Sequence, residues 1–195
     1  MAKIPKVFQP LTVAVLTISN RHTAESDSSG DLLCQLLSDA GHLPQHRAIV
    51  PSALYQIRAA VSQLICDNNH QVILLSGGTG FAPDNCTVAA ISVLFDQKIE
   101  GFGELFRQLS FADIGSAALQ SNAVAGLANH KLLVAMPGSP AACQLAMQQL
   151  VLPQLDARQG PCNFVPQLGP AQHQPAAGKQ LPEQQFCCQH NSQQE

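Results

Sequence analysis

The chain has 195 residues, a formal net charge of −3 at pH 7, and charged side chains at only 12% of its positions. This length suits one domain with a substantial core, and the lack of clustered Lys and Arg argues against nucleic-acid binding. No apolar run is long enough to cross a bilayer, and the first residues lack the apolar segment of a signal peptide. We therefore expect a cytoplasmic protein with no nucleic-acid partner and no membrane partner.

The first part of the chain predicts alternating strands and helices. Residues 11–18 are a β-rich apolar run, typical of a strand buried on both faces. After a polar loop, four leucines between positions 32 and 37 mark one face of a helix. Residues 47–50 form a short predicted strand, and Ser52 can cap the helix that follows. The predicted buried positions of that helix are Ile57, Val61, Leu64 and Ile65.

The most informative local motif is a strand that ends at a glycine turn. A strand is predicted at 71–76 around the apolar run Val-Ile-Leu-Leu, Gly-Gly-Thr-Gly follows at 77–80, and a helix is predicted over 87–95. Glycine reaches positive φ without strain and lets bare N–H groups approach an anion. The motif is neither a P-loop nor a Rossmann fingerprint, because it lacks Gly-Lys-Ser/Thr and the third glycine. The alternative interpretation is a tight turn that binds nothing.

The second part of the chain predicts one more buried strand, at 132–136, and a helix that Ser139 caps and Pro140 begins. Residues 101–106 have a looser pattern, and residues 116–128 have a helical one. Strands that alternate with helices imply an α/β fold with a mostly parallel sheet covered on both faces.

Ligands in such sheets bind beyond the carboxyl ends of the strands. The loops that begin at Ser19, Pro51, Gly77 and Pro137 follow four predicted strands. We therefore expect these loops to converge on one site.

From residue 166 onward the chain is rich in Gln, Pro and His and has little apolar periodicity. Such a segment cannot bury enough surface to offset its ordering entropy, so 166–195 is a predicted disordered tail. The predicted ligand-binding domain spans 11–165, after an N-terminal extension of residues 1–10.

The seven cysteines are scattered, and most lie within apolar patterns, as expected of reduced and buried side chains. Cys187 and Cys188, with His190 nearby, could bind a metal ion. Because no second pair lies at zinc-like spacing, a metal site there is the weaker alternative.

Nine segments together resemble the MoaB family of molybdenum-cofactor biosynthesis proteins, which is close to the MogA enzymes and the gephyrin-type domains. The segments, in order, are LTISNR at 16–21, DSSG at 27–30, AGH at 40–42, SGGTG at 76–80, EGFGE at 100–104, LQS at 119–121, AMPGS at 135–139, PQLDAR at 153–158 and PCNF at 161–164. The resemblance covers about residues 10 to 168 and is far more specific than the glycine turn alone.

This resemblance implies a three-layer α/β/α fold whose mostly parallel sheet includes one antiparallel strand. It also implies a homo-oligomer, either a trimer or a hexamer. The implied ligand is molybdopterin, a dithiolene pterin with a terminal phosphate. MogA-type relatives and some MoaB proteins join that phosphate to AMP from Mg-ATP.

Thirteen positions are implied to contact the ligand, through backbone N–H groups, hydroxyl groups or carboxylates. They are Ser19, Asp27, Ser29, Gly30, Gly77, Gly78, Thr79, Gly80, Glu104, Ser121, Pro137, Gly138 and Ser139. Two of them have alternative interpretations: Asp27 can cap the first helix, and Glu104 without the resemblance is a solvated helix-start carboxylate.

Three polar positions depart from the family pattern. Asn85 and Ser52 stand where active relatives carry aspartates, and Asn122 stands where they carry an arginine. Asp84, beside Asn85, is a weak candidate for holding Mg²⁺. Losing one electrostatic contact of this kind costs about 10²–10³ in rate. The changes therefore favour retained ligand binding over turnover.

Two functional hypotheses remain at this point. The chain is either an Mg-ATP-dependent molybdopterin adenylyltransferase, or an oligomer that binds molybdopterin or a nucleotide as a carrier or scaffold. A nucleotide-binding domain outside molybdenum metabolism is a third and weaker alternative.

Overall fold

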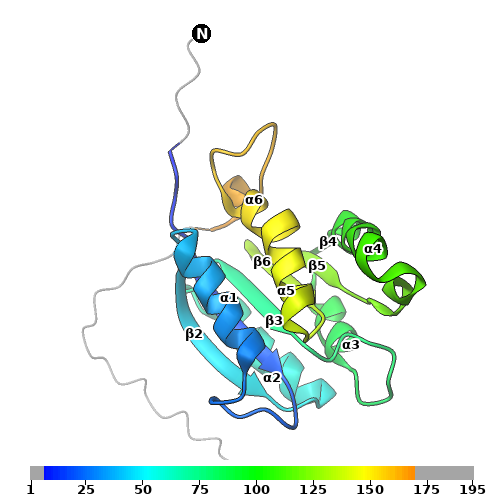
Figure 1. Ribbon diagram of the computed structural model, residues 1–195. Helices are drawn as coiled ribbons and strands as arrows, with labels where there is room; N and C mark the ends of the chain where they lie inside the picture. Colours follow the sequence, from blue (N-terminus) through cyan, green and yellow to red (C-terminus); the bar gives the residue numbers. More distant parts are fainter. Residues whose placement is uncertain (1–6, 170–195) are drawn as a thin grey trace, which may run out of the picture.

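The computed structural model describes residues 7–169, in which six strands form one sheet in the order β2-β1-β3-β6-β5-β4 (Figure 1). The strands are β1 Thr12–Ile18, β2 Leu43–Val50, β3 Val72–Ser76, β4 Gln97–Lys98, β5 Val124–Ala128 and β6 Lys131–Met136. β1 pairs in parallel with β2 and β3, β3 pairs in parallel with β6, and β5 runs antiparallel to both β6 and β4. The mostly parallel sheet with one antiparallel strand is thus confirmed.

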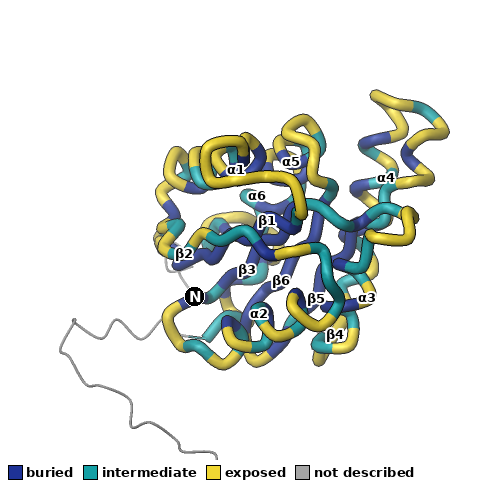
Figure 2. Tube along the Cα trace, turned by 90° about the horizontal axis from the view of Figure 1, so that it is seen from below, coloured by how far each residue is buried: buried dark blue, intermediate teal, exposed yellow. Residues whose placement is uncertain are grey.

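Helices cover both faces of this sheet, which makes three layers (Figures 1 and 2). On one face, α1 (Ser28–Asp39), α5 (Pro140–Ala146) and α6 (Leu152–Leu155) pack on one set of alternating strand residues. On the other face, α2 (Leu54–Cys66) and α3 (Thr87–Ile91) pack on the alternate set. Successive strand residues point to opposite faces, so the central strands are apolar at nearly every position.

In the same layer as α1, α5 and α6 form one continuous helix from Pro140 to Leu155, because a π-helical turn at Met147–Val151 joins them. Ser139 caps it, as predicted, by accepting a hydrogen bond from the N–H of Ala142 at 3.3 Å, and Pro140 occupies the first turn.

The remaining helix, α4 (Glu100–Ile114), stands away from the body of the molecule (Figure 2). Phe102 and Phe106 bury its inner face, but Leu105 and Phe111 are exposed. A 3₁₀ helix at Gly115–Gln120 leads from α4 back to β5.

Several element predictions were wrong. Residues 116–128 are not a helix: they form this 3₁₀ helix and β5, and α4 was missed because Gly101 and Gly103 weaken its helical pattern. The strand predicted at 47–50 is longer and begins at Leu43. Ser52 does not cap α2, whose N-cap is Ala53 without a side-chain hydrogen bond.

Within residues 7–169, no helix is long and apolar enough to span a membrane, and no group of three or more His, Cys, Asp or Glu side chains is arranged to hold a metal ion. The described cysteines are all free thiols. Cys187, Cys188 and His190 lie outside the described residues, as does most of the tail predicted at 166–195. The start of that prediction was wrong, because a 3₁₀ helix at Val165–Gln167 continues into it.

Candidate functional site

The carboxyl ends of the parallel strands bring the predicted loops together. The N–H of Ser19 donates to the carbonyl of Val50 at 3.0 Å, and the N–H of Gly77 donates to the carbonyl of Met136 at 3.0 Å. The Cα of Gly77 also packs closely beneath Gly138, where a Cβ atom would lie 3.0 Å away. The convergence of the loops after β1, β2, β3 and β6 is therefore confirmed.

The glycine turn needs its glycines. Gly77 and Gly78 have φ angles of 96° and 63°, which side chains disfavour. A Cβ atom at Gly78 would lie 2.3 Å from the Thr87 hydroxyl oxygen. That buried hydroxyl donates to the carbonyl of Gly77 at 2.8 Å, and the Thr87 N–H donates to the carbonyl of Gly78 at 3.0 Å. The start of α3 thus holds the turn in a fixed shape.

The turn leaves backbone donors available to a ligand. The N–H of Gly77 is used by Met136, whereas those of Gly78, Thr79 and Gly80 have no acceptor among the described residues. Successive free N–H groups in a turn of positive φ form a concave anion-binding surface. This geometry supports the predicted anion role of the glycine turn.

The start of α1 lies next to this turn. The Ser29 hydroxyl donates to the carbonyl of Gly138 at 2.7 Å, which ties α1 to the loop after β6. Ser29 and Gly30 are both buried, so the two sequence motifs form one packed surface.

Asp27 is placed as a structural residue. It is 1% exposed, and its carboxylate accepts hydrogen bonds from the Gly30 N–H, the Thr17 hydroxyl and the Arg47 guanidinium at 2.9–3.0 Å. Burial raises the pKa of this carboxyl group, but the hydrogen bonds, led by that of Arg47, outweigh burial and leave the pKa below its usual value. The geometry is that of the capping alternative.

A cavity of about 260 Å³ opens beside the loop after β6. It is lined by Ser121, Pro137 and Ser139 together with residues of α4 and α5, including the buried Ser110 and the carboxylate of Asp113. This places three of the thirteen predicted residues around one space next to the glycine turn.

The three departing positions do not lie together. The Ser52 hydroxyl donates to the backbone carbonyl of Asp84 at 2.6 Å, and Asn85 lies against Gly80, whose Cβ would be 2.7 Å from the Asn85 amide nitrogen. Asp84 is exposed and follows the last glycine of the turn by four residues. Mg²⁺ is commonly held by one or two carboxylates plus substrate phosphates. Asn122 instead lines a separate hollow with Lys98 and Arg107.

Other residues are placed outside this cluster or were missed. Glu104 lies on the exposed face of α4 and has no partner among the described residues. Thr87 and Arg47 were not predicted, although they hold the glycine turn and Asp27. The position of Thr87, at the first residue of the helix after the glycines, could have indicated its contact with the turn. Nothing near Arg47 in the sequence indicates its role.

Comparison with known proteins identifies the family. Residues 14–157 match the family model described as "Probable molybdopterin binding domain". The molybdenum cofactor biosynthesis protein B of Escherichia coli strain K12 is 48% identical over 168 residues, which are 86% of this chain and 99% of that protein. The chain belongs to the MoaB family of molybdenum-cofactor biosynthesis proteins.

Solved structures of MoaB proteins share the fold. A crystal structure of a molybdenum cofactor biosynthesis protein B superposes with a TM-score of 0.74 and 40% identity, over 78% of this chain and 94% of that one. The tungsten cofactor synthesizing protein MoaB from Pyrococcus furiosus superposes with a TM-score of 0.63 and 27% identity, over 72% and 89% of the two chains. The residues that match the family model, 14–157, include the glycine turn and the loop after β6.

Proposed function

We propose that the chain binds molybdopterin at the carboxyl edge of its sheet, with the glycine turn on the terminal phosphate. The observation that carries this proposal is the set of free N–H groups at Gly78, Thr79 and Gly80, in a turn fixed by Thr87. The adjacent cavity, with Ser121 and Ser139 in its wall, can accept the pterin. We assign this role to the domain at 11–165, in a protein whose cytoplasmic location stays a prediction.

Binding without turnover fits the side chains around the turn. Transfer of AMP to a phosphate requires neutralisation of spread negative charge by cations and a carboxylate-held metal. Ser52 and Asn85 are neutral, and the hydroxyl of Ser52 already donates to the backbone carbonyl of Asp84. Mg-ATP-dependent adenylylation is the second candidate, which the exposed carboxylate of Asp84, four residues after the turn, favours.

The deciding experiment measures adenylyl transfer from α-labelled ATP to purified molybdopterin, beside an equilibrium titration of molybdopterin without ATP. We expect saturable binding and no transfer above a protein-free control. Transfer above that control would establish the enzyme, and absence of binding would overturn the proposal.

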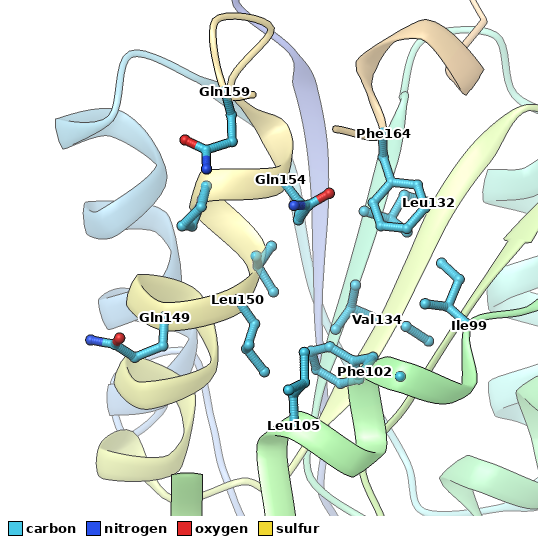
Figure 3. A pocket seen from close by; sticks show the side chains of 14 residues that line it. Ile99, Phe102, Leu105, Leu132, Val134, Gln149, Leu150, Gln154, Gln159 and Phe164 are labelled. Atoms are coloured by element: carbon cyan, nitrogen blue, oxygen red, sulfur yellow. The ribbon is translucent and has the colours of Figure 1, made fainter. Parts of the chain in front are cut away.

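We also propose a homo-oligomer, built through the outer face of α4. Leu105 and Phe111 are 50% and 62% exposed. Next to them, an apolar groove of about 390 Å³ runs between α4 and the α5–α6 helix, with Phe102, Leu150 and Phe164 in its walls (Figure 3). An exposed apolar surface of this kind marks a protein interface. The molar mass in solution, measured by light scattering, should be three or six times that of the chain.

A further inference from the structure

A second polar hollow lies at the edge of the sheet, where β4 and β5 meet the start of α4. Its volume is about 130 Å³. The residues around it come from three elements: Lys98 from β4, Glu100 and Arg107 from α4, and Asn122 from the segment before β5. None of these side chains belongs to the glycine turn.

Arg107 is the unusual member of this group. It is half-buried, yet its guanidinium has no hydrogen bond or ion pair with any residue in the described part of the chain. By contrast, Arg47, Arg58 and Arg158 each donate to protein oxygen atoms. A guanidinium with no protein partner keeps its five N–H donors available to an anion, which it can bind through two parallel hydrogen bonds.

Gly103 makes room for this guanidinium. Gly103 and Arg107 are one helical turn apart on α4, so they share a face. A Cβ atom at Gly103 would lie 2.9 Å from the Nη1 atom of Arg107 and 2.7 Å from the backbone carbonyl of Ala123. The missing side chain therefore lets the guanidinium lie along the helix, at the wall of the hollow.

The charges around the hollow favour an anion. The Nζ atom of Lys98 lies 3.0 Å from the carboxylate of Glu100, so these two charges offset each other. Arg107 then leaves one net positive charge, and the amide of Asn122 can add a neutral donor. One water molecule occupies about 30 Å³ in the liquid, so the space suits a group the size of phosphate.

We propose that this hollow binds a phosphate-class anion, with the guanidinium of Arg107 donating to two of its oxygens. The site is distinct from the glycine turn, because Ser121 lines the cavity near Ser139 whereas Asn122 lines this hollow. The proposal does not depend on molybdopterin binding. The phosphate comes either from the free anion or from a phosphorylated small molecule.

The test is a titration of the full-length protein with inorganic phosphate at low salt. The readout is the set of Nε–H signals of its arginine side chains in ¹H–¹⁵N NMR. The Arg107 signal, assigned by its loss in Arg107→Gln, should move saturably. Calorimetry should show at least about tenfold weaker phosphate binding in Arg107→Gln. Arg58→Gln removes the same charge on the other side of the sheet and should leave the affinity unchanged.

A variant that should bind phosphate more tightly strengthens the test. Glu100→Gln removes the negative charge from the hollow and should tighten phosphate binding, while Arg107→Lys should restore only part of the affinity lost in Arg107→Gln. A glycerol phosphate titration separates the two sources: equal affinity indicates a phosphorylated molecule, and loss of affinity indicates the free anion. An Arg107 signal that does not move, or phosphate binding that survives in Arg107→Gln, would overturn the proposal.

Discussion

At the residue scale, the ion pair of Asp27 and Arg47 holds the start of α1 against β1 and β2. The carboxylate is buried, whereas 31% of the Arg47 side chain is exposed. Asp27→Asn keeps an N-cap side chain but removes the charge, so we expect a loss of about 1–3 kcal/mol in the free energy of unfolding. Urea unfolding measures this loss. The control is Asp31→Asn, which removes the exposed carboxylate that also pairs with Arg47 and should cost less than about 1 kcal/mol.

The difference in stability between the unaltered protein and Asp27→Asn should also depend on pH. Because the pKa of Asp27 is lowered in the folded state, its stabilisation is fully present above the unfolded pKa and is lost as the pH falls through the folded pKa. The unaltered protein and Asp27→Asn should therefore converge in stability in acid. A difference that persisted below both pKa values would contradict the ionic explanation.

The variant Asn85→Asp tests whether the missing charge at the turn limits adenylyl transfer. Asn85→Asp places a second carboxylate beside Asp84, which can complete a Mg²⁺ site together with substrate phosphates. If this ligand alone is lacking, Mg-ATP-dependent adenylylation should rise by up to about 10². The matched control is Asn122→Asp, which adds the same charge in the other hollow and should give no gain. No gain in Asn85→Asp would show that this charge alone does not limit adenylyl transfer.

His70 should make the fold sensitive to mild acid. Burial lowers its pKa, as do His46 and Lys131, whereas Asp67 raises it, and the ring nitrogen Nδ1 is buried without a partner among the described residues. The imidazole is neutral in both states above the unfolded pKa of about 6.5. Below it, the unfolded chain binds the proton first, so the free energy of unfolding should fall until the folded pKa is reached.

Urea unfolding between pH 7 and pH 5 measures this loss. His70→Gln should flatten the profile, while His22→Gln, in an exposed loop, should leave it unchanged. An equal slope in His70→Gln would assign the acid sensitivity to other groups, of which His42, also buried with a lowered pKa, is the first to examine.

At the element scale, β5 shows why composition can hide a strand. Its sequence, Val-Ala-Gly-Leu-Ala, lacks the β-branched run that marks β1 and β3. Gly126 is required there because a Cβ atom would lie 2.4 Å from the ring of Phe95. The glycine in this strand is thus required by Phe95, which lies 31 positions earlier in the chain. A local sequence pattern cannot report such a contact.

Gly126→Ala should consequently cost about 1–3 kcal/mol through overpacking against Phe95. Gly101→Ala is the control, since nothing lies within 4 Å of a Cβ atom built there. Inside α4 that change should stabilise the protein by about 0.5–1 kcal/mol through helix propensity. Thermal unfolding of both variants measures the two effects, and equal shifts would refute the packing explanation.

The same distinction separates the predictable parts of the site from the rest. The glycine turn and the Ser139 cap were predictable because their contacts lie within ten residues, as in the bond from Thr87 to Gly77. The bond from Ser29 to Gly138 spans 109 positions, and only the fold brings the two together. The buried strands β1, β3 and β6 were predicted well, since apolar runs report burial on both faces directly.

At the scale of the whole molecule, the proposed ligand site and the proposed assembly surface lie at different parts of one sheet. The carboxyl edge of β1, β3 and β6 carries the glycine turn and the cavity, which fits the rule that ligands bind beyond strand ends. The antiparallel end of the sheet supports α4, whose outer face is apolar. The proposed ligand cavity lies against the inner face of α4 and the proposed assembly surface on its outer face, so substitutions should affect the two separately.

Leu105→Glu tests that separation. The side chain is half exposed at the mouth of the apolar groove, so a charge there costs little in an isolated chain but must be desolvated in an oligomer. Sedimentation should show a fall in mass toward the single chain, with molybdopterin binding retained. Tyr55→Glu, at a side chain that is 74% exposed on α2, should leave the mass unchanged. An oligomer that survives Leu105→Glu would show that the chains associate through a face other than that of α4.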